Sequence, residues 1–460
     1  MPAVSEFSTT RTEIGGIPVT ELAKQFGTPT YVYDATKIVE RINDLSAFDA
    51  IRYAQKANSN IAIVDLVRRH GVLVDAVSAG EIHRALAAGY KPGGEPPAIV
   101  FTADIFDHDA LALVVEHDIH VNCGSPDMID QLGEVAPGRN ITLRVNPGFG
   151  HGHSQKTNTG GEQSKHGIWH EQIDDCLRRA DHYGLGVTGL HMHIGSGTDL
   201  EHLAQVCGAM ETLAFSVGRT ITNISAGGGL PVAYKQQDSF VDIEQYFGLW
   251  DATRKRLAES FGHKISLEIE PGRYLSAESG YLIAEIRAIK RMGGNTFYIV
   301  DAGFNNLARP IMYGSYHPIS IAPASGDVER GEAVKKLGQA PRSYAKSLQD
   351  TDIHSEPVPF FHSLGMQDVV VGGPLCESGD IFTQEEGGFV AKRSLPVASI
   401  GDYLVIECAG AYGFVMSSNY NSKPMAAEVL IQGENAHLVR ARQTYQDLLR
   451  GESIPPQSQS

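Results

Sequence analysis

The sequence lacks several patterns that mark common classes of protein. It has no long apolar run, which argues against a membrane-spanning helix, and no internal repeat is visible. Its five cysteines are scattered without a Cys-x-x-Cys pair, so neither a structural zinc site nor a disulfide framework is expected. The N-terminus shows no charged segment followed by an apolar one, which favours a cytoplasmic location. Basic residues are few, and the net charge of −16 argues against binding to nucleic acid.

What is present is the composition of an ordinary globular protein, with 460 residues and 42% hydrophobic content, enough for two or three domains. Between residues 35 and 280, short apolar runs alternate with amphipathic helical stretches. We expect strands at residues 51–56, 72–77, 98–102, 119–123, 141–146, 187–194, 221–226 and 265–270. Eight strands, each followed by a helix, predict a closed (β/α)8 TIM-type barrel. An open doubly wound sheet is the alternative.

After residue 280 the pattern changes to strand-like runs separated by turns, which predicts a second, mostly antiparallel β-barrel or sandwich domain. The strands expected there cover residues 282–289, 297–300, 369–371, 403–408 and 427–431, and a short helix covers 443–449. Residues 323–360 are polar and rich in Gly, Pro, Lys and Ser, so they form an inserted or mobile loop. Residues 1–34 form a lead-in with one strand at 30–33.

Reactive side chains stand where the predicted barrel strands end. Lys56 closes the first strand, and a partly desolvated lysine at a barrel mouth suits a Schiff base, although an ordinary solvated lysine is the alternative. His191 and His193 are two residues apart on one face of a strand. Three interpretations compete: the two histidines bind a metal, they are core histidines, or one imidazole stacks on a ligand ring. A metal needs further ligands, for which His151 and His153 in a glycine-rich loop are poor candidates, so we favour stacking.

Two loops have the features of an anion site. Gly227-Gly228-Gly229 follows the seventh strand, and Glu270-Pro-Gly-Arg273 follows the eighth. Barrels frequently bind phosphate with the loops after these two strands. A lysine, a glycine cradle, a ring-stacking histidine and a carboxylate on one rim are the groups that pyridoxal 5′-phosphate (PLP) requires. A carboxylate at the pyridine nitrogen keeps it protonated, which favours decarboxylation.

The second domain adds three turns with functional side chains. Cys376-Glu377 stands between glycines, so the thiol is either a proton donor beside a carboxylate that meets a substrate amine or a small buried residue. Tyr412 lies in Gly-Ala-Tyr-Gly, and Arg309 and Tyr313 share another turn. Such Arg and Tyr side chains suit a phosphate or a carboxylate.

Taken together, these motifs are specific. The chain resembles the diaminopimelate decarboxylase family of alanine-racemase-like, fold type III PLP enzymes over nearly its whole length. The resemblance is carried by YAQKAN, VDAVSAGE, RVNPGFGHGHSQKTNTGGEQSKHG, GLHMHIGSG, SAGGGL, EIEPGRY, VDAGFNNLARPIMYGSYH, GPLCESGD and GAYGFVMSSNYNSKP. Departures are Gly197, where many relatives have Gln, and Lys165-His166-Gly167 in place of a commoner Lys-Phe-Gly.

The resemblance implies a role for each of these residues. Lys56 carries PLP and His193 stacks on its ring, with Glu270 at the ring nitrogen. The other cofactor-binding residues it implies are Asp75, Ser196, Gly227, Gly228, Gly229, Gly272, Arg273 and Tyr412. Substrate binding falls to Arg273, Arg309, Tyr313, Glu377 and Tyr412, with Cys376 as the proton donor and no metal.

The resemblance also implies an assembly and a reaction. Residues 1–34 join residues 281–460 in the second domain, and the protein is a homodimer in which Cys376 and Glu377 reach the partner's site. The reaction is decarboxylation of meso-2,6-diaminopimelate at its D-centre to L-lysine and CO2, the last step of lysine biosynthesis. Arg309 with Tyr313 favours a substrate with a second carboxylate over ornithine, lysine or arginine. Two further hypotheses are a metal-dependent hydrolase using His191, His193 and Lys56, and a non-catalytic PLP-binding protein.

Overall fold

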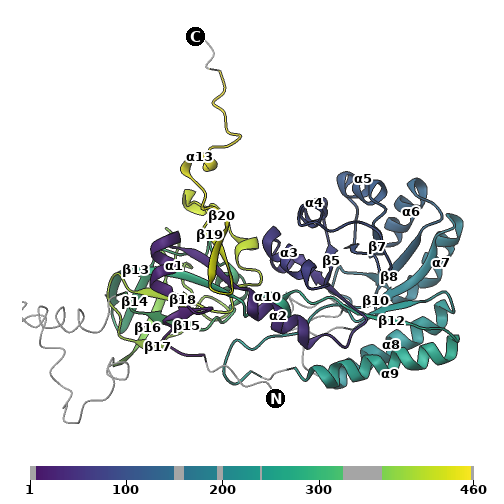
Figure 1. Cartoon of the computed structure of the whole chain (residues 1–460), viewed down its shortest axis with the longest axis horizontal. Coiled ribbons are helices and arrows are strands. Elements are labelled where there is room, and N and C mark those ends of the chain that lie inside the picture. Colours follow the sequence, from purple (N-terminus) through teal and green to yellow (C-terminus); the bar gives the residue numbers. More distant parts are fainter. Residues whose placement is uncertain (1–6, 150–159, 194–199, 239–240, 325–364, 457–460) are drawn as a thin grey trace, which may run out of the picture.

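The structure is a computed structural model of the chain, and it describes residues 7–149, 160–193, 200–238, 241–324 and 365–456. Two units lie side by side, a helix-covered barrel and a sheet-rich unit, and the C-terminal segment extends away from both (Figure 1). Within the described ranges, no helix is long and apolar enough to cross a bilayer.

The barrel is a ring of parallel strands. Their order is β4-β5-β6-β7-β8-β10-β11-β12, and β12 pairs with β4 to close the ring. The predicted TIM-type barrel is therefore confirmed, and the open doubly wound sheet is wrong. The strands are β4 (Ala50–Ala54), β5 (Leu73–Ala76), β6 (Ile99–Ala103), β7 (His120–Cys123), β8 (Asn140–Asn146), β10 (Gly186–His191), β11 (Asn223–Ser225) and β12 (Ser266–Ile269), with the short β9 (Ile168–Trp169) beside β8.

Amphipathic helices cover the outside of the barrel, as Figure 1 shows. They are α2 (Ala35–Asp44), α3 (Ile61–Arg69), α4 (Ala79–Ala87), α5 (His108–Glu116), α6 (Pro126–Val135), α7 (Ile173–His182), α8 (Leu200–Val217), α9 (Ile243–Phe261) and the single turn α10 (Arg273–Ser276). Their ends follow local rules. Ser125 caps α6 by accepting a hydrogen bond from the Met128 amide, and Pro126 takes the first helical position.

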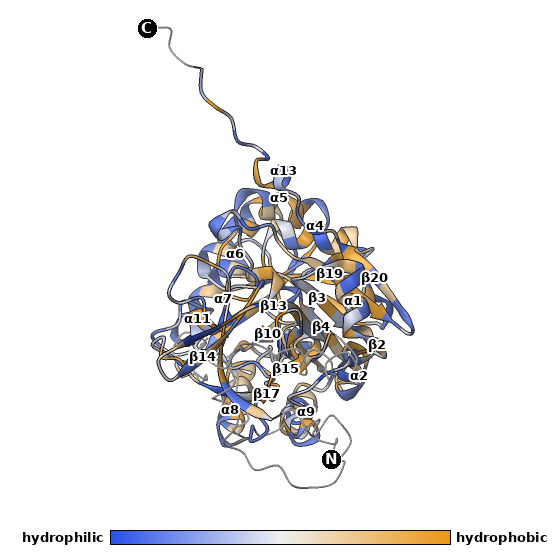
Figure 2. Ribbon diagram, turned by 90° about the vertical axis from the view of Figure 1, so that its left-hand side faces the viewer, coloured by the Kyte–Doolittle hydropathy of each residue, from blue (hydrophilic) through white to orange (hydrophobic). Residues whose placement is uncertain are grey.

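The second unit is a mostly antiparallel sheet with the order β17-β16-β14-β13-β3-β19-β20, and β18 pairs with both β13 and β15. Its strands are β3 (Thr30–Asp34), β13 (Gly280–Met292), β14 (Asn295–Val300), β15 (Ile319–Ala322), β16 (Met366–Gly372), β17 (Arg393–Pro396), β18 (Tyr403–Ile406), β19 (Ala427–Gln432) and β20 (Asn435–Arg440). β3 comes from the segment before the barrel, yet it lies between β13 and β19. In Figure 2, β13 shows much orange, whereas the barrel helices α4, α8 and α9 mix blue and orange residues.

Some expected elements were wrong or incomplete. The lead-in holds a helix, α1 (Val19–Phe26), and two short strands, β1 (Glu13–Ile14) and β2 (Ile17–Pro18), besides β3. β15, β17 and β20 were not expected, and the predicted closing helix is the shorter α13 (Tyr445–Leu448). Most of the predicted loop at 323–360 lies outside the described residues.

The two units meet where backbone packs on backbone. A Cβ added at Gly410 would lie 1.8 Å from the carbonyl oxygen of Ser276, at the end of α10. Gly410 also approaches Gly280, the first residue of β13. Only glycine fits such a contact, so the loop that carries Tyr412 is fixed against the end of the barrel.

Candidate active site

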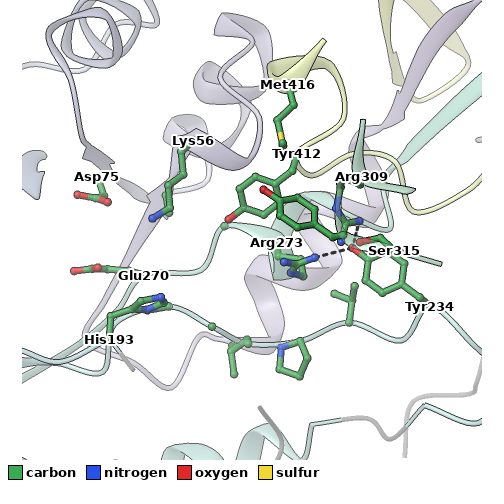
Figure 3. Close-up of a pocket in the computed structure, with 18 of the residues that line it drawn as sticks. Lys56, Asp75, His193, Tyr234, Glu270, Arg273, Arg309, Ser315, Tyr412 and Met416 are labelled. Atoms are coloured by element: carbon green, nitrogen blue, oxygen red, sulfur yellow. Dashed lines mark hydrogen bonds between the residues drawn. The ribbon is translucent and has the colours of Figure 1, made fainter. Parts of the chain in front are cut away.

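A cavity of about 700 Å³ lies between the carboxyl ends of the barrel strands and the second unit. Barrel residues on its wall include Lys56, Asp75, His193 and Glu270, and the second unit contributes Arg309 and Tyr412 (Figure 3). Gly228, Gly229, Gly272, Arg273 and Tyr313 line it as well. The structure thus brings together most of the side chains that the sequence singled out.

Lys56 stands slightly beyond the strand that was predicted to carry it. β4 ends at Ala54, and Lys56 lies in the 3-10 turn η1 (Gln55–Ala57). Its side chain is exposed to the wide cavity, so the expected desolvation is wrong. The turn nevertheless directs the amine toward Asp75 and Glu270 (Figure 3).

Two buried carboxyl groups near Lys56 have opposite electrostatic surroundings. Burial, together with the charge of Glu270, raises the pKa of Asp75 well above its usual value. Within the described residues, Oδ1 of Asp75 has no hydrogen-bond partner. Burial also disfavours the charged form of Glu270, but His191 and His193 outweigh it and lower the Glu270 pKa. The site therefore holds one carboxyl that tends to stay neutral and one that is ionised.

Glu270, which follows β12, is held by hydrogen bonds from the barrel itself. Nε2 of His191 lies 2.6 Å from Oε2 of Glu270, and the Ser225 hydroxyl donates to Oε1 at 3.0 Å. Because a carboxylate oxygen accepts, Nε2 carries the imidazole hydrogen. These contacts fix an ionised carboxylate that can accept a further hydrogen bond from a protonated ring nitrogen.

The two histidines have different surroundings. β10 ends at His191, so His193 lies past the strand and not on its face as predicted. Nδ1 of His193 accepts a hydrogen bond from the Gly228 amide at 2.8 Å. Burial, together with the positive charges of Lys56 and Arg144, lowers the His193 pKa well below its usual value, which leaves a neutral, planar ring on the cavity wall.

A metal pair was one interpretation of His191 and His193. No group of three or more His, Cys, Asp or Glu side chains that could hold a metal occurs in the described ranges. His151 and His153, the further metal ligands considered from the sequence, lie outside those ranges, as do Ser196 and Gly197.

The glycine loop packs closely against the backbone at the ends of the barrel strands, and Gly228 and Gly229 line the cavity. A Cβ at Gly228 would lie 2.5 Å from the Glu270 carbonyl oxygen, and a Cβ at Gly227 2.4 Å from that of Met192. Gly227 and Gly229 have positive φ angles of 63° and 97°, which favour glycine. A Cβ at Gly272 would meet Ala54 at 3.0 Å. Only glycine fits these close contacts, which hold the loop against the backbone beside Glu270 and Met192.

Two arginines form the opposite end of the cavity. Nη1 of Arg273 and Nη1 of Arg309 each donate to the hydroxyl of Tyr234 at 3.1 Å. The Arg273 guanidinium also lies over the Tyr412 ring, 5.2 Å from its centroid. Arg309 begins the short helix α11 (Arg309–Tyr313), and its side chain is buried. Two positive charges at this end suit an anionic group of a ligand.

Sequence reasoning missed several residues of the wall, among them Thr102, Arg144 and Tyr234. Arg144 could have been predicted, because it lies near the carboxyl end of β8 (Asn140–Asn146), where the functional side chains of barrel enzymes are found. Tyr234 gave no such signal, since it belongs to an irregular loop.

Cys376 and Glu377 do not line this cavity within the described part of one chain. Both are exposed, the Cys376 amide donates to Oδ1 of Asn421, and Tyr420 hydrogen-bonds Glu377 at 3.4 Å. The alternative of Cys376 as a small buried residue is therefore wrong.

The fold and this site define a class of protein. Residues 36–277 match the family model "Pyridoxal-dependent decarboxylase, pyridoxal binding domain". The residues fit PLP: an accessible lysine, a buried acid held by its own donors, and two glycines on the cavity wall. The chain is a pyridoxal-dependent decarboxylase of the barrel type.

Its relatives narrow the class. Diaminopimelate decarboxylase of Escherichia coli K12 is 51% identical over 440 residues, covering 96% of this chain and 97% of that protein. The Streptomyces coelicolor enzyme of the same name is 51% identical, covering 94% and 91%. A crystal structure of diaminopimelate decarboxylase has a TM-score of 0.86 at 50% identity, covering 96% and 98%. One from Helicobacter pylori, complexed with L-lysine, has a TM-score of 0.77 at 28% identity, covering 94% and 98%. The chain belongs to the diaminopimelate decarboxylase family.

Proposed function

We propose that the protein converts meso-2,6-diaminopimelate to L-lysine and CO2. One observation carries the proposal: a lysine and a buried carboxylate occupy one end of a cavity whose other end holds two arginines. The first pair suits PLP, and the second suits a carboxylate distant from the reacting centre. The names of the relatives support the same substrate. Decarboxylation of ornithine, lysine or arginine is the alternative.

Several residues would hold PLP. Lys56 would bond its aldehyde carbon, His193 would face the ring, and Glu270 would accept a hydrogen bond from its nitrogen. When bound, PLP supplies the electron sink that stabilises the carbanion left by loss of CO2. The remaining contacts proposed are Asp75, Gly227, Gly228, Gly229, Gly272, Arg273 and Tyr412, with Ser196 from outside the described residues.

The substrate would span the cavity. Its reacting centre lies near Lys56, and its second carboxylate meets Arg273, Arg309 and Tyr313. A diamine acid such as ornithine would bring an ammonium group to the arginines and be repelled. Tyr412 would contact both PLP and the substrate.

We propose that the protein is a homodimer and that the partner subunit supplies the proton donor and the contact for the distal amine. Cys376 would return a proton to the reacting carbon and Glu377 would meet the distal amine, both from the partner subunit. Their exposure outside the cavity of one chain supports this arrangement. Residues 35–280 would form one domain and residues 1–34 with 281–460 the other, in a cytoplasmic enzyme.

The test combines binding with product analysis. The protein as purified should show visible absorption from PLP, and borohydride reduction should fix the cofactor to the Lys56 peptide, as read by mass spectrometry. Lys56→Ala should lose both signals and all CO2 release. Lysine formed from meso-diaminopimelate, with no product from ornithine, supports the substrate. A preference for ornithine would replace the proposal with the alternative.

A further inference from the structure

The phenol of Tyr234 occupies an unusual position between two cations. Arg273 and Arg309 both donate to its oxygen, each at 3.1 Å, and the Arg309 guanidinium also lies 5.1 Å from the ring centroid (Figure 3). A hydroxyl can accept two hydrogen bonds and donate one. Among the residues that the structure describes, both partners of this hydroxyl are donors. Its own hydrogen is therefore left for an acceptor inside the cavity.

His317 makes a second contact with Arg309. Nη1 of Arg309 donates to Nε2 of His317 at 3.0 Å, and Nδ1 of His317 lies 3.0 Å from the Glu407 carbonyl oxygen. Because a carbonyl can only accept, Nδ1 carries the hydrogen and Nε2 is the acceptor. The His317 ring also packs edge-on against Tyr234, with centroids 5.4 Å apart. Arg309 thus has a single supported orientation.

The loop that carries Tyr234 is itself fixed. Oδ2 of Asp238 accepts hydrogen bonds from the amides of Tyr234 and Lys235, both at 2.9 Å. This turn follows the glycine cradle, so one loop serves both ends of the cavity. This support matters because a donor that is held in place positions a ligand more precisely than a mobile one.

Figure 3 separates the two ends: Lys56, Glu270 and His193 lie on one side, and Tyr234 and Arg309 on the other. In the decarboxylation, the bond between the reacting carbon and its carboxyl carbon breaks, CO2 leaves, and the carbon gains a proton. The carboxylate near Tyr234 is then the one that the product keeps.

We infer that Tyr234 is a positioning and specificity residue, whose phenol aligns Arg273 with Arg309 and donates its hydrogen to the carboxylate that the substrate retains. The inference rests on the proposed function and deepens it. It adds a neutral donor to the two guanidiniums, which selects a carboxylate over an amine at this end.

Tyr234→Phe in the PLP-loaded enzyme tests this, because it removes the hydroxyl and keeps the ring. We expect the KM for meso-diaminopimelate to rise about tenfold, since hydrogen bonds to charged groups are strong, while kcat stays within about twofold. Binding of two ligands is then measured by calorimetry. L-lysine keeps the carboxylate, so its Kd should also rise about tenfold. 1,5-Diaminopentane lacks it, and its Kd should not change.

Tyr298→Phe is the matched control, because it removes a buried hydroxyl that bonds the Ala398 amide away from the cavity. In Tyr298→Phe, the Kd for L-lysine and the Kd for 1,5-diaminopentane should equal those of the wild type. Unchanged diaminopentane binding shows that the Tyr234→Phe site is folded and loaded. If Tyr234→Phe does not fold, Asp238→Ala is used instead, because it removes the acceptor that holds the turn of Tyr234. Asp238→Ala should weaken the binding of L-lysine and leave the binding of 1,5-diaminopentane unchanged.

An unchanged lysine Kd, or equal weakening of both ligands, would overturn the inference. Failure of the proposed function looks different. In that case the wild-type enzyme itself would not release CO2 from diaminopimelate, while the comparison of lysine with diaminopentane would still report on Tyr234.

Discussion

His191 shows how one side chain sets the charge of another. It is buried, it donates to Glu270 at 2.6 Å, and Nδ1 has no hydrogen-bond partner in the described part of the chain. A nitrogen left unpaired in the core is costly. The fold tolerates it here beside the acid that the proposed mechanism needs in its ionised form.

Removing His191 should change stability in acid. A carboxyl whose pKa is depressed in the folded state stabilises it above the ordinary pKa, and this stability is lost as pH falls through the folded value. In His191→Leu, burial dominates and raises the Glu270 pKa above its ordinary value, so the folded state binds this proton more tightly than the unfolded state and the variant should lose less stability on acidification than the wild type. At neutral pH the variant should be about 1–3 kcal/mol less stable.

The measurement is the melting temperature of the cofactor-free protein as a function of pH. His191→Gln is the control, because its amide can donate to the same oxygen and should retain much of the wild-type acid profile. Coincident profiles for Leu and wild type would contradict the prediction.

Much of the site could be predicted from residues at strand ends. Lys56, Glu270 and the glycine loop follow apolar strands, so a barrel must bring them to one rim. The exposure of Lys56 and the contacts of Tyr234 could not be predicted, because both depend on the second unit and on loop geometry.

At the scale of elements, the contact between Gly410 and the end of α10 fixes the loop that carries Tyr412. The Tyr412 amide donates to the Ala57 carbonyl at 2.8 Å, next to Lys56. Tyr412 also has a positive φ of 56°, which is uncommon outside glycine. Surrounding contacts must hold it there, and the close approach of Gly410 to the end of α10 is one of them.

Gly410→Ala should therefore disrupt both stability and cofactor binding. The added methyl group must displace the Ser276 backbone or its own loop, and we expect a loss of about 1–3 kcal/mol or more in the free energy of unfolding. PLP affinity should fall with it. Gly208→Ala is the control: the glycine is exposed in α8 with nothing within 4 Å, so it should be neutral or stabilising by up to about 1 kcal/mol. Equal stability of the two variants in urea would contradict this.

Element prediction succeeded where burial is strong. The barrel strands were predicted because both faces are covered, which makes them continuous apolar runs. β20 (Asn435–Arg440) was missed because no residue in it is fully buried, so pairing with β19 and not its own pattern defines it. α1 was missed although it is amphipathic, since a short stretch before the first apolar strand gave little context.

For the whole molecule, the proposed dimer makes a prediction about mixing. Lys56→Ala and Cys376→Ala should each be inactive as homodimers. After subunit exchange, about half of the dimers are mixed, and each mixed dimer has one intact site, so about a quarter of the wild-type activity should return. CO2 release measured before and after mixing reports it. Mixed dimers, purified with two different affinity tags, that stay inactive would exclude a shared site.

The position of β3 in the sheet has a consequence for folding of the chain during its translation. This strand leaves the ribosome ahead of the entire barrel, while β13 and β19, the two strands it joins, follow only after the barrel is made. The barrel strands can close early, but the other sheet must wait for the last part of the chain. A fragment starting at residue 281 would lack the strand that joins β13 to β19 and should aggregate on expression, unless a peptide with the sequence of β3 is supplied in trans.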